Sequence, residues 1–215
     1  VTVSLDSLDP AVFAHMSGGR GDLSAVLEGI ETACAAGFEG GVKINTVVQR
    51  GVNDAGVPDI LARFRHTGVT VRLIEYMDVG NRNGWECADV VPSCELRARI
   101  AALWPLEPLP PRYRGEVARR YHYVDGAGEI GFVSSVSAPF CGACSRARLS
   151  SDGKLYTCLF ATIGTDLRAV LRGNDHDVEV NERLRTTLSR IWRHRADRYS
   201  EERTRQPALL VNGEK

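Results

Sequence analysis

The sequence has 215 residues, of which 43% are hydrophobic, so it is long enough to bury a large core in one or two domains. Lysine and arginine together number 27, as do aspartate and glutamate, and this balance gives no basic excess that would favour nucleic-acid or anionic membrane partners. Without an apolar run of about 18 residues or a signal-peptide pattern, we expect a cytoplasmic protein whose six cysteines are thiols or metal ligands rather than disulfides.

Predicted strands and helices alternate over the first 77 residues. The first helix begins after Asp22, a suitable N-cap, and ends at Gly37, with Cys34 on its apolar face as an expected core residue. Such alternation is typical of parallel strands joined by crossover helices, so the fold class is α/β. The strands are expected within residues 1–5, 42–48 and 69–77, and a second helix within residues 57–68.

One face of these strands is polar. If Val3 and Val71 face the helices, the opposite face carries Lys43, Asn45 and Arg72, since side chains alternate along a strand. A parallel sheet covered on both faces is normally apolar throughout. Two interpretations stay open: a salt-bridge set at the strand ends, or the lumen of a barrel or half-barrel that binds a polar anionic ligand.

The second half is predicted to be a smaller α+β domain, giving domains at residues 1–92 and 93–215. After a loop, Ser93 is a plausible N-cap for a helix, and a Pro-rich stretch near residues 105–115 is expected to be extended. A hairpin is predicted around Asp125-Gly126-Ala127-Gly128. Helices are predicted at residues 165–172 and 180–191.

Three cysteines stand close together in "FCGACSRARLSSDGKLYTCLF". Asp152-Gly153 predicts a two-residue hairpin turn, which would place Leu149 opposite Tyr156 and bring Cys158 within a few residues of Cys144. The three thiols are therefore able to form one cluster.

Their spacing alone leaves three kinds of site open. A structural zinc would require a fourth ligand, for which His122 and Cys87 are candidates. An iron–sulfur cluster held by three cysteines would leave one iron open to a ligand. A redox Cys-x-x-Cys pair is less favoured, because no strand-then-helix context surrounds it. Arg146 and Arg148 favour an anionic or purine ligand, although surface charges on a hairpin are an equally simple interpretation.

Five stretches resemble the GTP 3',8-cyclase family of radical S-adenosylmethionine (SAM) enzymes, which open molybdenum cofactor biosynthesis. They are "VTVSLDSLDP", "VKINTVVQRGVND", "VRLIEYMDVGNRNGW", "GEIGFVSSVSAPFCGACSRARLSSDGKLYTCLF" and "DLRAVLR". The resemblance covers nearly the whole chain in order. It implies the C-terminal part of an incomplete (β/α) barrel followed by a domain that holds a second [4Fe-4S] cluster.

The resemblance also implies roles for individual residues. The metal ligands would be Cys141, Cys144 and Cys158. They would bind three irons of the second cluster, and its fourth iron would meet the GTP base. The GTP contacts would be Lys43, Arg146, Ala147 and Arg148. The SAM contacts would be Ser4 and Met77.

In that family, a first cluster reduces SAM and releases a 5'-deoxyadenosyl radical. This radical takes a hydrogen from ribose C3', and the resulting C3' radical closes onto guanine C8. The resemblance implies that cyclic pyranopterin monophosphate synthase acts next in the pathway, and it implies a tendency to form homodimers.

The sequence departs from the family pattern in two places. The Cys-x3-Cys-x2-Cys motif of the first cluster is absent, and "VNGEK" replaces the Gly-Gly tail. We therefore expect a fragment that is inactive alone. The alternatives are a non-catalytic zinc or cluster module that binds a nucleotide, and a sibling radical SAM enzyme, which Lys43 and the two arginines disfavour. Cys34, Cys87 and Cys94 match no ligand position.

Overall fold

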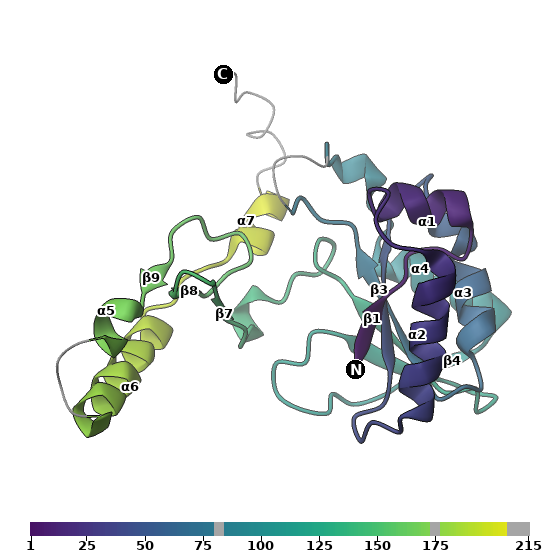
Figure 1. Cartoon of the computed structure of the whole chain (residues 1–215). Coiled ribbons are helices and arrows are strands. Elements are labelled where there is room, and N and C mark those ends of the chain that lie inside the picture. The colour runs from purple at the N-terminus through teal and green to yellow at the C-terminus, as the bar shows by residue number, and fades with distance from the viewer. Residues whose placement is uncertain (80–83, 173–176, 206–215) are drawn as a thin grey trace. The chain divides into compact units, whose positions relative to one another are not determined.

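The computed structural model describes residues 1–79, 84–172 and 177–205, and it divides into two compact units, Val1–Phe140 and Cys141–Lys215 (Figure 1). These units differ from the predicted domains, because the helix and hairpin expected in the second domain belong to the first compact unit. The boundary between functional domains at residue 92 stays a prediction. The "VNGEK" end and part of the predicted loop, residues 80–83, lie outside the described residues.

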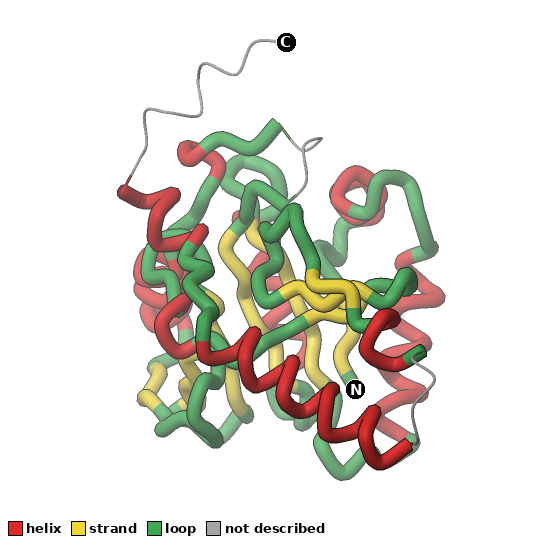
Figure 2. Tube along the Cα trace, turned by 90° about the vertical axis from the view of Figure 1, so that its left-hand side faces the viewer, coloured by secondary structure: helices red, strands yellow, loops and turns green. Residues whose placement is uncertain are grey.

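A six-stranded mixed sheet forms the centre of the first unit, in the order β1-β2-β3-β6-β5-β4. Its strands are among those drawn in yellow in Figure 2. The first four strands in this order are parallel to one another, and β5 runs antiparallel to both of its neighbours, β6 and β4. The α/β class and the parallel strands are confirmed. The predicted hairpin is also confirmed, as β5 and β6. The strands are β1 (Thr2–Ser4), β2 (Lys43–Val48), β3 (Thr70–Glu75), β4 (Leu106–Pro108), β5 (Arg119–Tyr123) and β6 (Glu129–Val133).

Helices lie on one side of the β1-β2-β3 part of the sheet (Figure 1). Their apolar side chains pack with the buried strand residues Ile44, Val48 and Val71 in a single core. Burial of this apolar surface is the main stabilising contribution to the unit. The helices of this unit are α1 (Pro10–Met16), α2 (Leu23–Ala35), α3 (Val57–Phe64) and α4 (Ser93–Leu103).

The predicted cap of α2 is confirmed, because the Asp22 carboxylate accepts a hydrogen bond from the Ala25 amide at 2.9 Å. The expectation that Cys34 is a core residue is wrong: its side chain is exposed. The buried stripe of α2 runs through Ile30 to Ala33 instead, so position 34 falls outside it.

A fully buried carboxylate joins three segments at the end of β3. Glu75 accepts hydrogen bonds from the Ser93 amide (2.7 Å) and hydroxyl (2.8 Å), and from the amides of Val136 and Ser137 (both 2.8 Å). Ser93 is therefore the first residue of α4 rather than its N-cap, which is Pro92. The Ser93 hydroxyl binds Glu75 instead of capping the helix.

Among its described residues, the second unit contains a small antiparallel sheet in the order β7-β8-β9 and three α-helices. The predicted helix at 165–172 is shorter than expected, because its first residues form β9. The long amphipathic helix is confirmed as α6. The elements are β7 (Arg148–Leu149), β8 (Lys154–Tyr156), β9 (Thr165–Asp166), α5 (Arg168–Leu171), α6 (Asp177–Arg193) and α7 (Tyr199–Arg205).

The predicted register of the β7–β8 hairpin is wrong by one residue. Leu149 pairs with Leu155 rather than Tyr156, and the turn spans three residues between Ser150 and Lys154. The Ser150 side chain accepts from the Lys154 amide at 3.1 Å, and Gly153 has φ +79°, which suits the left-handed position of a three-residue turn. A shift of one residue exchanges the faces of a strand. In the observed register, counting back places position 146 opposite position 158.

Candidate functional site

The polar face of the first unit is built as the strand alternation predicted. Arg72, on β3, donates through Nε to the Asn45 side chain at 2.8 Å and through an Nη to the Thr2 hydroxyl at 3.3 Å. Burial lowers the pKa of Arg72 from its ordinary value. Among the described residues, neither Arg72 nor Lys43 forms an ion pair with a carboxylate. This arrangement does not fit the salt-bridge set that was one of the two interpretations.

A pocket of about 190 Å³ opens on this face. Its cations are more numerous than its carboxylates, and Glu129 already pairs with Arg112 (3.0 Å) and Arg120 (2.8 Å). Lys43 donates to the carbonyl of Gly40 at 3.0 Å, which leaves its charge without a counter-ion at the pocket. The pocket therefore suits an anion. The charged residues that line it are Lys43, Arg72, Arg112, Glu116, Arg120 and Glu129.

The residues expected to bind SAM lie toward the carboxyl ends of the strands. Ser4 is the last residue of β1 and pairs with Asn45, and Met77 follows β3 by two residues. Lys43, by contrast, is the first residue of β2 and pairs with Thr70. At about 3.3 Å per residue, Lys43 and Met77 are separated by roughly 20 Å along the strand direction. The structure thus spreads these residues along the strand direction rather than gathering them at one strand end.

The three clustered cysteines all lie in the second unit, outside its strands and α-helices. Cys141 opens a 3-10 turn, Cys141–Ala143, and its carbonyl accepts from the Cys144 amide at 3.2 Å, while Cys158 follows β8. All three side chains are half-buried free thiols. Within the part of the chain that the structure describes, no three His, Cys, Asp or Glu side chains are grouped closely enough to hold a metal ion. The structure brings the cysteines into one unit without assembling a finished metal site.

Arg146 makes Cys144 unlike an ordinary thiol. Burial acts to raise the pKa of Cys144, but hydrogen bonds from the Arg146 amide and side chain and from Arg195 outweigh it and lower the pKa to about 7. The Arg146 Nε lies 3.4 Å from Sγ. The thiolate is the form that binds metals, so the donor chemistry of this unit fits iron or zinc. Ala147 and Arg148 follow and are both exposed, and Arg148 is the first residue of β7.

The candidates for a fourth zinc ligand lie in the first unit. His122, on β5, has its Nε2 at 3.1 Å from a Glu107 carboxylate oxygen, and Cys87 is an exposed residue of a 3-10 turn. Cys94 is also exposed. Sequence reasoning missed Arg195, whose guanidinium donates a hydrogen bond to the carbonyl of Cys144. The two residues are 51 positions apart in the sequence, and nothing in the sequence indicated that contact.

Residues 69–201 match the family described as Molybdenum Cofactor Synthesis C, over more than half of the chain. The chain belongs to this family. The match includes all three clustered cysteines and both arginines behind them.

Several relatives of the chain are named GTP 3',8-cyclase. The chain is 51% identical over 201 residues to GTP 3',8-cyclase of Acidothermus cellulolyticus, 94% of this chain and 55% of that protein. It is 55% identical over 203 residues to the GTP 3',8-cyclase of Xanthomonas campestris pv. campestris strain B100, 94% of this chain and 58% of the relative. It is 47% identical over 213 residues to the GTP 3',8-cyclase of Synechococcus sp. (strain WH7803), which is 94% of this chain and 59% of that protein. The chain thus spans less than two thirds of the length of these relatives.

The predicted family is confirmed by these matches, and the chain is homologous to GTP 3',8-cyclase. In the described residues, no helix is both long and apolar enough to cross a membrane.

Proposed function

We propose that this chain provides the GTP-binding and second iron–sulfur portion of a GTP 3',8-cyclase, in the first step of molybdenum cofactor synthesis. The observation that carries the proposal is the second unit, where three half-buried free thiols accompany an arginine that stabilises one of them as thiolate. Homology to proteins named GTP 3',8-cyclase supports the choice of substrate.

In this proposal Cys141, Cys144 and Cys158 hold a [4Fe-4S] cluster. The cluster, when bound, supplies one iron with an open coordination position for the guanine base. Three thiolates suffice for such a cluster, whereas a structural zinc site requires four ligands. This difference is why a set of three cysteines favours the cluster over a structural zinc.

Arg146, Ala147 and Arg148 are proposed to bind GTP. The two exposed guanidinium groups offer planar sets of donors to phosphate oxygens or to a base edge, and Ala147 contributes backbone contacts between them. Lys43, in the anion-suited pocket of the first unit, is proposed as a further GTP contact.

Ser4 and Met77 are proposed to contact SAM at the carboxyl ends of β1 and β3, the edge at which barrel folds of this class bind ligands. The open sheet of the first unit would then be part of an incomplete radical SAM barrel. These 215 residues lack the Cys-x3-Cys-x2-Cys motif, so we expect them alone not to convert GTP to 3',8-cyclo-7,8-dihydro-GTP. Cyclic pyranopterin monophosphate synthase would consume that product, and a homodimer is the proposed assembly.

Anaerobic reconstitution of the chain tests the cluster. We expect about four irons and a matching amount of sulfide per chain, and an electron paramagnetic resonance (EPR) spectrum of the reduced protein that changes when GTP is added. Bound zinc without iron would favour the alternative, a non-catalytic zinc module, and would refute this proposal.

Titration of GTP into the reconstituted chain tests the arginines. Each of Arg146→Ala and Arg148→Ala removes a charge-assisted contact of about 1.5–3 kcal/mol, so the Kd should rise by about 10- to 150-fold. Arg190→Ala, at an exposed position of α6 in the same unit, is the matched control and should leave the Kd unchanged. An unchanged Kd in the Arg146 and Arg148 variants would contradict their role.

A further inference from the structure

One short segment at the junction of α6 and α7 reaches all three clustered cysteines. It runs from Arg195 to Glu201, and we call it the 195–201 clasp. Arg195 donates a hydrogen bond to the main-chain carbonyl of Cys144. The Arg195 side chain is only 11% exposed, so the guanidinium is held in place largely out of water.

The clasp reaches Cys158 through its neighbour in the chain. The Thr157 hydroxyl donates to Oδ2 of Asp197 at 2.6 Å, and the same oxygen accepts from Nε of Arg195 at 3.3 Å. A continuous set of hydrogen bonds therefore joins the Cys144 carbonyl, Arg195, Asp197 and Thr157. The hydrogen bonds in this set involve charged groups, which makes them stronger than neutral ones.

The clasp reaches Cys141 through the turn that this cysteine opens. Oε1 of Glu201 accepts from the Gly142 amide at 3.1 Å, and its other oxygen pairs with Arg198 at 3.1 Å. A side chain at position 142 would meet Arg198, with a Cβ-to-Nη distance of 3.6 Å.

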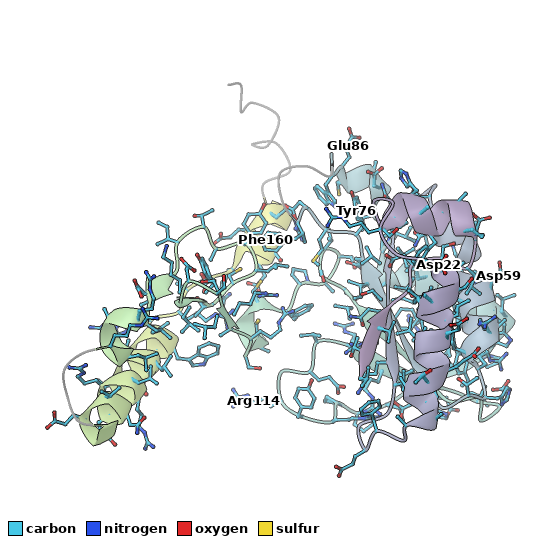
Figure 3. The ribbon with its side chains drawn as sticks, viewed as in Figure 1. Asp22, Asp59, Tyr76, Glu86, Arg114 and Phe160 are labelled. Atoms are coloured by element: carbon cyan, nitrogen blue, oxygen red, sulfur yellow. The ribbon has the colours of Figure 1, made fainter. Side chains whose placement is uncertain are left out.

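Aromatic packing holds the start of α7 against the loop after Cys158. The ring of Phe160, labelled in Figure 3, stacks on Tyr199 with centroids 4.2 Å apart, and the Arg203 guanidinium lies 5.5 Å from the Phe160 centroid. Stacked rings and a cation over a ring face both stabilise such a contact. The clasp is thus fixed to the unit at a point independent of its hydrogen bonds.

We propose that Arg195, Asp197 and Glu201 are positioning residues, which tie the three cysteine segments to one another so that the thiols can close on a single cluster. None of the three cysteines lies in a strand or an α-helix, so their positions depend on contacts such as these. The proposal rests on the cluster assigned under the proposed function. Asp197 and Glu201 act through Thr157 and Gly142, and Arg195 acts through the Cys144 carbonyl.

The test measures how fast the reconstituted chain loses iron to an excess of a ferrous chelator under anaerobic conditions. Asp197→Asn weakens the acceptor for both Thr157 and Arg195 and should accelerate iron loss by about tenfold, the effect of about 1.4 kcal/mol. Thr157→Val removes one hydroxyl while retaining the shape of the side chain, and a smaller acceleration is expected. Asp166→Asn, which removes the same charge from an exposed ion pair with Arg168 in the same unit, is the matched control and should behave as wild type.

A second measurement separates positioning from general destabilisation. The EPR spectrum of the reduced cluster should change in Asp197→Asn and Glu201→Gln but not in Asp166→Asn, and Asp197→Glu should restore part of the iron retention. If the wild type retains iron and Asp197→Asn and Thr157→Val lose it at the wild-type rate, the clasp proposal is refuted while the cluster stands. If wild type binds no iron, the proposed function fails and this proposal fails with it.

Discussion

Replacing Glu75 by glutamine should strongly destabilise the first unit. The carboxylate is fully buried, and both of its oxygens accept hydrogen bonds. Oε1 accepts from the amide and hydroxyl of Ser93 and from the Ser137 hydroxyl, and Oε2 accepts from the amides of Val136 and Ser137. The side chain thereby connects the carboxyl end of β3 to the start of α4 and to the segment after β6.

The magnitude follows from the number of donors that glutamine cannot serve. Whichever oxygen becomes the amide nitrogen, one or two backbone amides then face an N–H group instead of an acceptor. Leaving a buried donor unsatisfied costs about 1–3 kcal/mol, so Glu75→Gln should lose about 1–6 kcal/mol. The free energy of unfolding of a typical domain is about 5–15 kcal/mol, so this loss is a substantial fraction of it.

Urea unfolding followed by tryptophan fluorescence measures the effect. In a Trp192→Phe background the remaining tryptophans, Trp85 and Trp104, both lie in the first unit. With a slope of about 2 kcal/mol/M, the midpoint should fall by about 0.5–3 M. Glu28→Gln, at an exposed position of α2, should not move it. A Glu75→Gln midpoint within about 0.3 M of wild type, roughly 0.6 kcal/mol at that slope, would refute the reasoning.

Three further variants test local features by thermal or urea unfolding. Asp22→Ala removes the cap of α2 and should cost about 0.5–2 kcal/mol, with no loss expected from the exposed Glu28→Ala in the same helix. Gly153→Ala places a Cβ 2.5 Å from Cγ of Arg168 at a φ of +79° and should cost at least about 1–2 kcal/mol; wild-type stability would contradict the turn. Burial raises the pKa of Asp6 despite a hydrogen bond from Val47, so the wild type loses stability as the pH rises from 3.8 through the folded-state pKa. The free energy of unfolding of Asp6→Asn should therefore rise relative to that of the wild type as the pH increases above about 4, and a constant difference would show that Asp6 does not titrate in this way.

Local patterns in the sequence predicted the elements well where one residue decides the outcome. Asp22 capped α2 as expected, and the alternation in β2 and β3 placed Lys43 and Arg72 on a polar face. The predictions failed where two local backbone conformations compete. The hairpin after Leu149 had both a two-residue and a three-residue turn available, and the Ser150 side chain favoured the longer one by accepting from Lys154.

Long-range contacts account for what the sequence did not show. The buried stripe of α2 passed through Ala33 rather than Cys34 because the strands beneath the helix determine which residues are covered. In the site, the three cysteines and Arg146 were found from spacing and resemblance. Arg195 and Asp197 were missed because their contacts span 51 and 40 residues, and side chains that bind backbone carbonyls or hydroxyls leave no periodic pattern.

Because β3 pairs with β6, the central sheet of the first unit can be completed only after β6 has left the ribosome. Val71 pairs with Ile130, a separation of 59 residues, although the two strands are neighbours in the middle of the sheet. Until residue 133 has been synthesised, one edge of β3 has no partner, and its backbone groups are open to non-native pairing. Contacts of this separation also slow folding, because the intervening loop must close first. Truncations that end before β6 are therefore expected to aggregate, whereas chains that extend just beyond it contain the whole central sheet.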